Sequence, residues 1–147
     1  MRHLTLATAL MLLAAPLQAE GVSLRSTDMS FDDVAFGVEN AILGEGLVID
    51  HVNEVGEMLA RTREDVGSDV VIYEKAKTYS LCSATTSRAV MEADATLLAF
   101  CPYGIFIMVR ADTPEVTEIG RIDYPDGPMD EVEALLDRII EAALDGF

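Results

Sequence analysis

The chain has 147 residues, half of them hydrophobic, and its 26 acidic and 10 basic side chains give a formal net charge of −16. Such a charge repels phosphate backbones and anionic lipid faces, which excludes nucleic acid and membrane surfaces as partners. The length fits one domain with one core, and the sequence contains no internal repeat, linker or low-complexity tract.

The first residues, MRHLTLATALMLLAAPLQA, have the pattern of a secretory signal peptide. A basic Arg2 precedes an apolar stretch too short for a membrane span, and the small Ala19 suits a cleavage site. We expect residues 1–19 to be removed, leaving residues 20–147 as a single domain in the periplasm or secreted. Because the leader carries one basic residue and no acid, its loss changes the net charge from −16 to −17. We expect no membrane insertion after cleavage.

An amphipathic helix is the first clear element of the mature chain. Ser30 is a suitable N-cap, apolar residues recur at helical spacing from Phe31, and Gly44 ends the run. On either side, residues 22–28 and 47–52 have the composition of short strands.

A second helix is predicted from the cap Asn53 to about Val66, where Gly67 ends it. Residues 70–82 mix β-branched and aromatic side chains with charges, which favours extended structure. A third helix then begins at Ser83 and runs to about Ala93.

The run LLAFCPYGIFIMVR at 97–110 is almost wholly apolar and is typical of a central strand, with Pro102 and Gly104 marking a bend near its start. Residues 116–124 alternate like a strand with one solvated face.

A final helix is predicted with Pro128 in its first turn, and it has the clearest pattern of all. Asp130 and Glu131 suit the helix dipole at its first turn. One apolar stripe is formed by Val132, Leu135, Leu136, Ile139, Ile140 and Ala143. We expect this stripe to pack on the sheet or in part on a partner subunit, so a homodimer is possible.

The predicted order of elements is βαβαβαββα. It indicates an α+β class: one compact domain with a mixed, mostly antiparallel sheet of about five strands and about four helices.

Cys82 and Cys101 are the only cysteines in the sequence. In an exported protein two cysteines most simply form a disulfide, which needs Cα atoms within about 7 Å. Parallel neighbouring strands would hold the two residues at opposite ends, so the disulfide requires antiparallel strands or a returning chain. Buried free thiols and a reactive or metal-bound pair remain as alternatives.

The start of the third predicted helix is a candidate anion or ligand site. Backbone N–H groups at a helix N-terminus attract anions and stabilise a thiolate, and Cys82 lies directly before it. The candidate residues are Ser83, Thr85, Thr86, Arg88 and Tyr103. The ordinary interpretation is that Ser83 caps the helix and Cys82 fills the core.

The sequence supports no catalytic residue, metal or cofactor. His51 is the only histidine after cleavage, and it has no local ligand spacing with either cysteine. There is no C-x-x-C and no G-x-S-x-G, so thioredoxin-like and hydrolase chemistry are disfavoured.

The segment AKTYSLCSATTSRAVMEADATLLAFCPYGIFIMV resembles the domain of unknown function 302 (DUF302) family. The matching motifs are Cys82-Ser83-Ala84, the helix from Ser87 to Asp94, and the start of the strand from Cys101 to Ile105. Upstream, SFDDVAFGVENAILGEGLVIDH is similar to the family's opening helix and following turn. Leu81 replaces the usual Phe, and Ala95 the usual Pro.

The resemblance covers about residues 24–124, and the strand end at 109–110 also departs from the family's Tyr-Glu. It implies a compact α/β domain that is often exported, with a dimer as an alternative to a monomer and with no activity to carry over.

Three hypotheses about function follow. The first is a non-enzymatic, exported accessory domain that binds a small ligand or a protein partner in a groove between sheet and helices. The alternative is a thiol-dependent redox or sulfur-handling protein that uses Cys82 with Cys101. The third is a homodimeric structural module whose final helix forms the interface.

Overall fold

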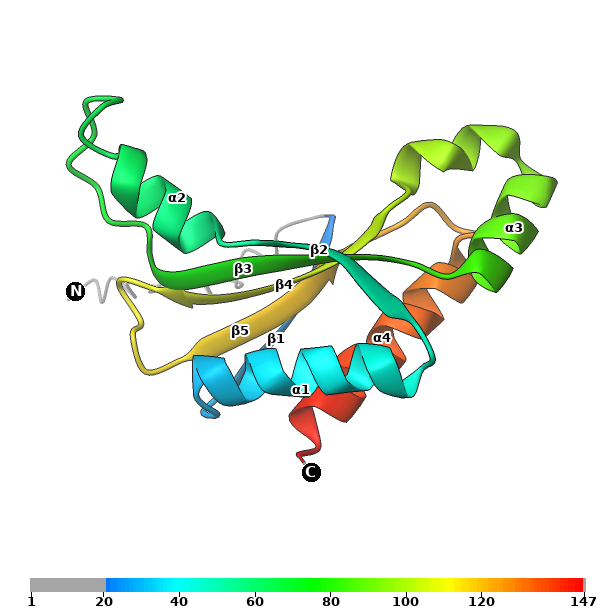
Figure 1. Ribbon diagram of the computed structural model, residues 1–147, viewed down its shortest axis with the longest axis horizontal. Helices are drawn as coiled ribbons and strands as arrows, with labels where there is room; N and C mark the ends of the chain where they lie inside the picture. The colour runs from blue at the N-terminus through cyan, green and yellow to red at the C-terminus, as the bar shows by residue number, and fades with distance from the viewer. Residues whose placement is uncertain (1–20, 147) are drawn as a thin grey trace, which may run out of the picture.

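The computed structural model describes residues 21–146, and the predicted signal peptide lies outside them (Figure 1). The elements are β1 (Val22–Thr27), α1 (Phe31–Gly44), β2 (Val48–Asn53), α2 (Val55–Thr62), β3 (Tyr73–Cys82), α3 (Ala84–Ala93), the 3-10 helix η1 (Ala95–Phe100), β4 (Tyr103–Arg110), β5 (Thr117–Ile122) and α4 (Asp130–Leu144). The five strands form one sheet in the order β1-β5-β4-β3-β2, and every neighbouring pair is antiparallel. The predicted α+β class and element order are confirmed.

One face of the sheet, which we call the covered face, packs on α1 and α4. Figure 1 shows these two helices together on one side of the sheet. Alternate residues of the central strands point into this layer and are fully or almost fully buried, namely Tyr79, Leu81, Tyr103, Ile105 and Ile107. The whole predicted stripe of α4 is buried in the same layer. The stripe therefore faces the chain's own core.

Gly37 allows α1 to approach α4 closely. A Cβ atom at this position would lie 3.1 Å from the Cα of Ala143 and closer still to the Ala143 carbonyl oxygen. Because both obstacles are backbone atoms, a side chain at position 37 would force the helices apart.

The opposite face of the sheet, which we call the open face, carries the other set of alternate residues. Phe106 and Met108 of β4 are only half-buried there, next to the fully buried Ile105 and Ile107. Figure 1 shows α2 at one end of this side, beyond β3, and α3 with η1 at the other end of the sheet.

The second predicted helix is shorter than its sequence pattern indicates. Asn53 is the last residue of β2, where its amide nitrogen donates to Thr78 Oγ1 at 3.2 Å, so it does not cap the helix. The helix ends at Thr62, and turns lead on to Gly67, which has the left-handed φ of 71° expected for a terminating glycine. Pairing of β2 with β3 takes precedence over the local capping signal.

The predicted strand at 97–110 is wrong over its first residues. Residues 97–100 belong to η1, because the Asp94 carboxylate accepts hydrogen bonds from Thr96 N at 2.8 Å and Thr96 Oγ1 at 2.7 Å and so starts a tight turn. The strand begins only at Tyr103, after Pro102. The connection between β3 and β4 thus consists of two short helices, α3 and η1.

Candidate functional site

The open face contains a groove of about 350 Å³, which we call the sheet-face groove. Its apolar lining comes from β1, α2 and β4 and includes Val22, Leu24, Val55, Phe106 and Met108. Leu24 is 38% exposed, which is high for a leucine in a strand of a small domain. The volume lies at the lower end of the range found for small-molecule sites.

Gly120 lies between two strands that line the groove. It is paired with Leu24 on one side and with Phe106 on the other. A Cβ atom on Gly120 would lie 2.9 Å from Phe106 Cζ and 3.1 Å from Leu24 Cδ1, and it would collide with the backbone oxygen of Ser23. The absence of a side chain lets the two apolar side chains approach each other over this glycine.

The charged side chains at the groove are already paired. Lys77 Nζ lies 3.0 Å from a Glu54 carboxylate oxygen, and Arg110 Nε lies close to Glu118 Oε2. Because each cation has its own carboxylate, the described residues that line the groove offer no free positive charge to an anionic ligand. Thr78, whose hydroxyl already accepts from Asn53, supplies a polar atom in the lining.

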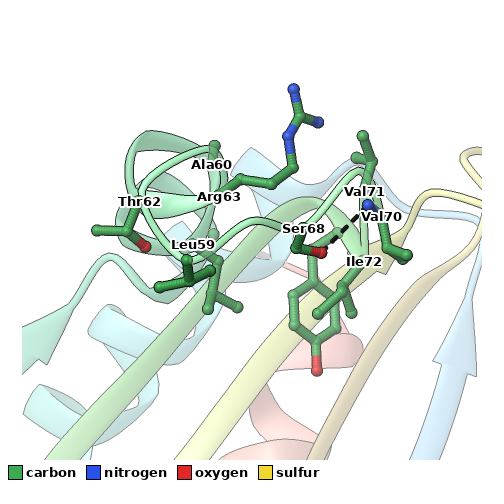
Figure 2. Close-up of a pocket in the computed structure, with 11 residues that line it drawn as sticks. Leu59, Ala60, Thr62, Arg63, Ser68, Val70, Val71 and Ile72 are labelled. Atoms are coloured by element: carbon green, nitrogen blue, oxygen red, sulfur yellow. Dashed lines mark hydrogen bonds between the residues drawn. The ribbon is translucent and has the colours of Figure 1, made fainter.

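A second and smaller cavity, of about 130 Å³, lies between α2 and the segment that follows it. Figure 2 shows Leu59 of α2 on one side of the cavity and Val70 and Ile72 on the other, with the Arg63 side chain extending away from it. Val70 N donates to Ser68 Oγ at 3.3 Å and closes the turn. This cavity is too small for most ligands and carries no reactive group, so the sheet-face groove is the stronger binding candidate.

The two cysteines lie side by side at one end of the sheet. Antiparallel pairing of β3 with β4 places Leu81 opposite Tyr103, so the end of β3 meets the start of β4. Cys82 Sγ and Cys101 Sγ are 2.9 Å apart, and both residues are half-buried. The strands are antiparallel, as a disulfide between these residues requires. The disulfide itself is not formed in this structure, where both residues are free thiols.

Asp50 is a third member of the cysteine site. It occupies a bulge in β2, where the pairing shifts between Ile49 and His51, directly beside Cys82. Burial, contact with Cys101 and the nearby Asp50 carboxylate together raise the pKa of the Cys82 thiol to about 12. Each effect favours the protonated thiol over the thiolate.

The structure brings some of the residues predicted to bind an anion together and leaves others at the surface. Ser83 is the N-cap of α3: its hydroxyl accepts from Thr86 N at 3.2 Å and donates to Thr86 Oγ1 at 3.1 Å. Thr85 is exposed, and Arg88 forms an exposed ion pair with Glu92 at 2.7 Å. The capping role of Ser83 is confirmed, and anion binding stays a prediction.

Tyr103, the fifth predicted site residue, is 1% exposed and belongs to the core. Its hydroxyl accepts from Ser87 Oγ at 3.1 Å, and desolvation by burial raises its pKa. Nearby, Thr86 Oγ1 donates to Glu131 Oε1 at 3.4 Å and ties α3 to α4. These contacts hold the start of α3 on the domain.

Sequence reasoning missed the groove residues and Asp50. The apolar run of β4 gives no sign that Phe106 and Met108 lie on a half-open face, since both faces of the strand carry apolar residues. Asp50 reaches Cys82 only through the bulge in β2, a feature without a local sequence signal. Within residues 21–146 there is no cluster of three or more His, Cys, Asp or Glu arranged to hold a metal, and no helix there is long and apolar enough to cross a membrane.

No protein-family model and no curated protein matches the chain. Among solved structures, it is similar to the crystal structure of an uncharacterised conserved DUF302 protein from Bacillus stearothermophilus. The TM-score is 0.57 at 16% sequence identity, and the alignment covers 86% of this chain and 90% of that chain. A likeness at this identity shows the fold alone. The chain therefore has a DUF302-like fold, as the sequence resemblance implies.

Proposed function

We propose that this protein is a non-enzymatic, exported binding domain whose sheet-face groove holds a small apolar molecule of neutral or positive charge. The observation that carries the proposal is the groove itself: about 350 Å³ over a sheet face whose apolar side chains, Leu24, Phe106 and Met108, remain partly open. A hollow of this size suits a small molecule, and single apolar residues scattered over a surface would not form one.

Charge determines which ligands are compatible with the groove. The cations at its rim, Lys77 and Arg110, are each neutralised by a carboxylate, and the whole chain carries a net charge of −16. An anionic ligand would be repelled at a distance and would find no free partner on arrival. A neutral or cationic apolar molecule meets neither obstacle.

The test is titration of the protein without its leader with a neutral apolar fluorophore, N-phenyl-1-naphthylamine. We expect saturable binding to the parent protein and to Met108→Leu. Met108→Glu, which places a carboxylate in the groove, should weaken binding at least about tenfold, because burying an unpaired charge against an apolar ligand is costly. Leu98→Glu is the matched control, since Leu98 is an exposed residue of η1 outside the groove.

Two results would overturn the ligand proposal. One is the absence of saturable dye binding by a parent protein that unfolds cooperatively. The other is sedimentation that shows a dimer which Met108→Glu dissociates, because a second copy of the chain would then occupy the face. Thermal unfolding of each variant separates loss of binding from loss of fold.

We also propose that Cys82 and Cys101 are joined by a disulfide once the protein has left the cytoplasm. The support is the 2.9 Å contact between the two sulfur atoms at one end of the sheet. Intact mass of the protein from its native compartment, alkylated with and without prior reduction, tests both proposals about maturation. Two added alkyl groups without reductant would contradict the disulfide, and a mass that includes residues 1–19 would contradict leader removal.

A further inference from the structure

We infer that Cys82 and Cys101 form a dithiol site that reacts with an external disulfide in a fixed order, with Cys101 attacking first and Cys82 closing the intrachain bond. The inference rests on the proposed disulfide between these residues and is independent of ligand binding in the groove. It assigns to the site a class of reaction partner, namely a disulfide-bearing small molecule or oxidoreductase.

The geometry already brings the two sulfur atoms together. They are in contact at 2.9 Å, one at the end of β3 and the other directly before β4. These strands are antiparallel neighbours, and their register is regular from the Lys75–Val109 pair up to the Leu81–Tyr103 pair. Closing the bond therefore needs only a small side-chain movement, and no strand has to change its register.

The surroundings of the two sulfur atoms differ. Cys82 is the last residue of β3 and is flanked by the carboxylate of Asp50 in the bulge of β2. Cys101 follows η1 and precedes the exposed Pro102, whereas Cys82 lies between the buried Leu81 and Ser83. An attacking thiol must reach a bulky disulfide and must be ionised, and Cys82 is the worse placed for ionisation.

Asp50 is a positioning residue that favours this order of reaction. Burial raises the pKa of the Cys82 thiol most, and contact with Cys101 and the Asp50 carboxylate add to the effect, so that the pKa reaches about 12 and Cys82 stays protonated at neutral pH. Because the thiolate is the nucleophile in exchange, Cys82 is a slow first attacker. The Asp50 side chain is exposed to solvent, so replacing it does not disturb the core.

The reaction consists of two exchanges. In the first, the Cys101 thiolate attacks one sulfur of the external disulfide, forming a mixed disulfide and releasing one thiol, which keeps the proton that Cys101 lost. In the second, Cys82 attacks the sulfur of Cys101, the mixed disulfide breaks, and a second thiol leaves with the Cys82 proton. The protein loses two electrons, and the external disulfide is reduced to two thiols.

The experiment follows reaction of the reduced protein with oxidised glutathione at pH 7 by intact mass. The parent protein should pass to the intrachain disulfide with little mixed disulfide. Cys82→Ser should accumulate one glutathione per chain on Cys101. Cys101→Ser should acquire glutathione at least about tenfold more slowly than Cys82→Ser, given how thiol exchange rates depend on thiolate content.

The role of Asp50 is tested in the Cys101→Ser background. Adding Asp50→Asn should raise the rate at Cys82 about two- to threefold, because removal of the negative charge favours the thiolate. Asp69→Asn, a change at an exposed acid outside this site, is the matched control and should leave the rate unchanged. The midpoint of the pH–rate profile should move to lower pH only in the Asp50→Asn variant, a shift that a purely structural effect would not produce.

Two outcomes would overturn the inference, and they are distinguishable. If Cys101→Ser reacts as fast as Cys82→Ser, or if Asp50→Asn slows the reaction, the assigned order is wrong while the proposed disulfide stands. If the parent protein forms mixed disulfides on both cysteines and never the intrachain bond, the proposed disulfide fails as well.

Discussion

The two faces of the sheet are built from adjacent residues of the same strands and yet differ in how they are packed. On the covered face, Ile105 and Ile107 are fully buried under α1 and α4. On the open face, Phe106 and Met108 remain half-buried, and no long helix of residues 21–146 packs over them. One strand therefore carries a closed core on one side and an unfilled apolar surface on the other.

This difference separates stability from binding. Full burial of an aliphatic side chain contributes about 1.5–3 kcal/mol to folding, whereas a half-exposed side chain contributes only part of that amount. Exposed apolar surface lowers solubility, and where it is contiguous it usually marks a surface that binds a ligand or a partner. We expect substitutions on the covered face to change unfolding, and substitutions on the open face to change binding.

The largest expected effect comes from truncating one residue on each face. Ile105→Ala should lower the free energy of unfolding by about 3 kcal/mol, because it leaves a cavity among closely packed side chains. Met108→Ala should cost only about 1 kcal/mol, because solvent already reaches its side chain. Urea unfolding of both variants measures the difference, and equal costs would remove the distinction between the faces.

The helix layer can be tested through two glycines of α1. Gly37→Ala should destabilise the protein by about 2 kcal/mol, since its Cβ meets the backbone of Ala143 in α4. Gly44→Ala is the control: a Cβ there meets no atom within 4 Å, and alanine favours the helix by up to about 1 kcal/mol. Thermal unfolding of the pair should give shifts of opposite sign.

The covered face includes an ion pair that should make stability depend on pH. Arg121 is 6% exposed, and its guanidinium donates two hydrogen bonds to Asp137, at 2.8 and 2.9 Å, which hold the pKa of that carboxyl below its ordinary value. Asp137 contributes stability that is present above its unfolded-state pKa of about 3.9 and is lost as the pH falls through the lower folded value.

Asp137→Asn should therefore lower stability by about 1 kcal/mol at pH 7, an amount reduced by the partial exposure of Asp137, and the difference from the parent should vanish near pH 2. Chemical denaturation across this range measures it. A difference that persists at pH 2 would mean that the carboxyl acts through packing and not through charge.

The smallest expected effect on stability lies in the groove. Leu24→Ser should change the free energy of unfolding by less than about 0.5 kcal/mol, because its side chain is partly exposed at the edge strand β1. The same substitution should weaken dye binding clearly, since Leu24 lines the groove. If Leu24→Ser lowers the free energy of unfolding and leaves the dye affinity unchanged, Leu24 belongs to the core and the proposed site is contradicted.

Local signals in the sequence predicted most of the fold. The caps at Ser30 and Ser83 act within a few residues, so α1 and α3 begin where the sequence indicates. The apolar stripe predicts α4 as well, although this helix begins at Asp130 and not with Pro128. The start of η1 was missed because the apolar residues at 97–100 fit a strand as well as a turn of helix. Only the capping by Asp94 distinguishes the two.

The candidate sites depend on contacts between segments that are distant in the sequence. Such contacts could not be predicted from the sequence alone. The pairing of Cys82 with Cys101 was predicted only as a condition on strand direction, which the antiparallel β3–β4 pair satisfies. The position of Asp50 requires the β2 bulge, and the groove requires knowing which face of β4 the helices leave uncovered. None of these follows from the spacing of residues along the chain.

Gly120 has a consequence for comparing proteins that share this fold. Leu24 and Phe106 can lie over position 120 only while it lacks a side chain, and β1 can pair so closely there only for the same reason. A homologous chain with alanine or a larger residue at this position would have to displace its edge strand and fill the hollow. The identity of this one residue is thus a marker that sorts such chains into those that keep a hollow on the open face and those that fill it.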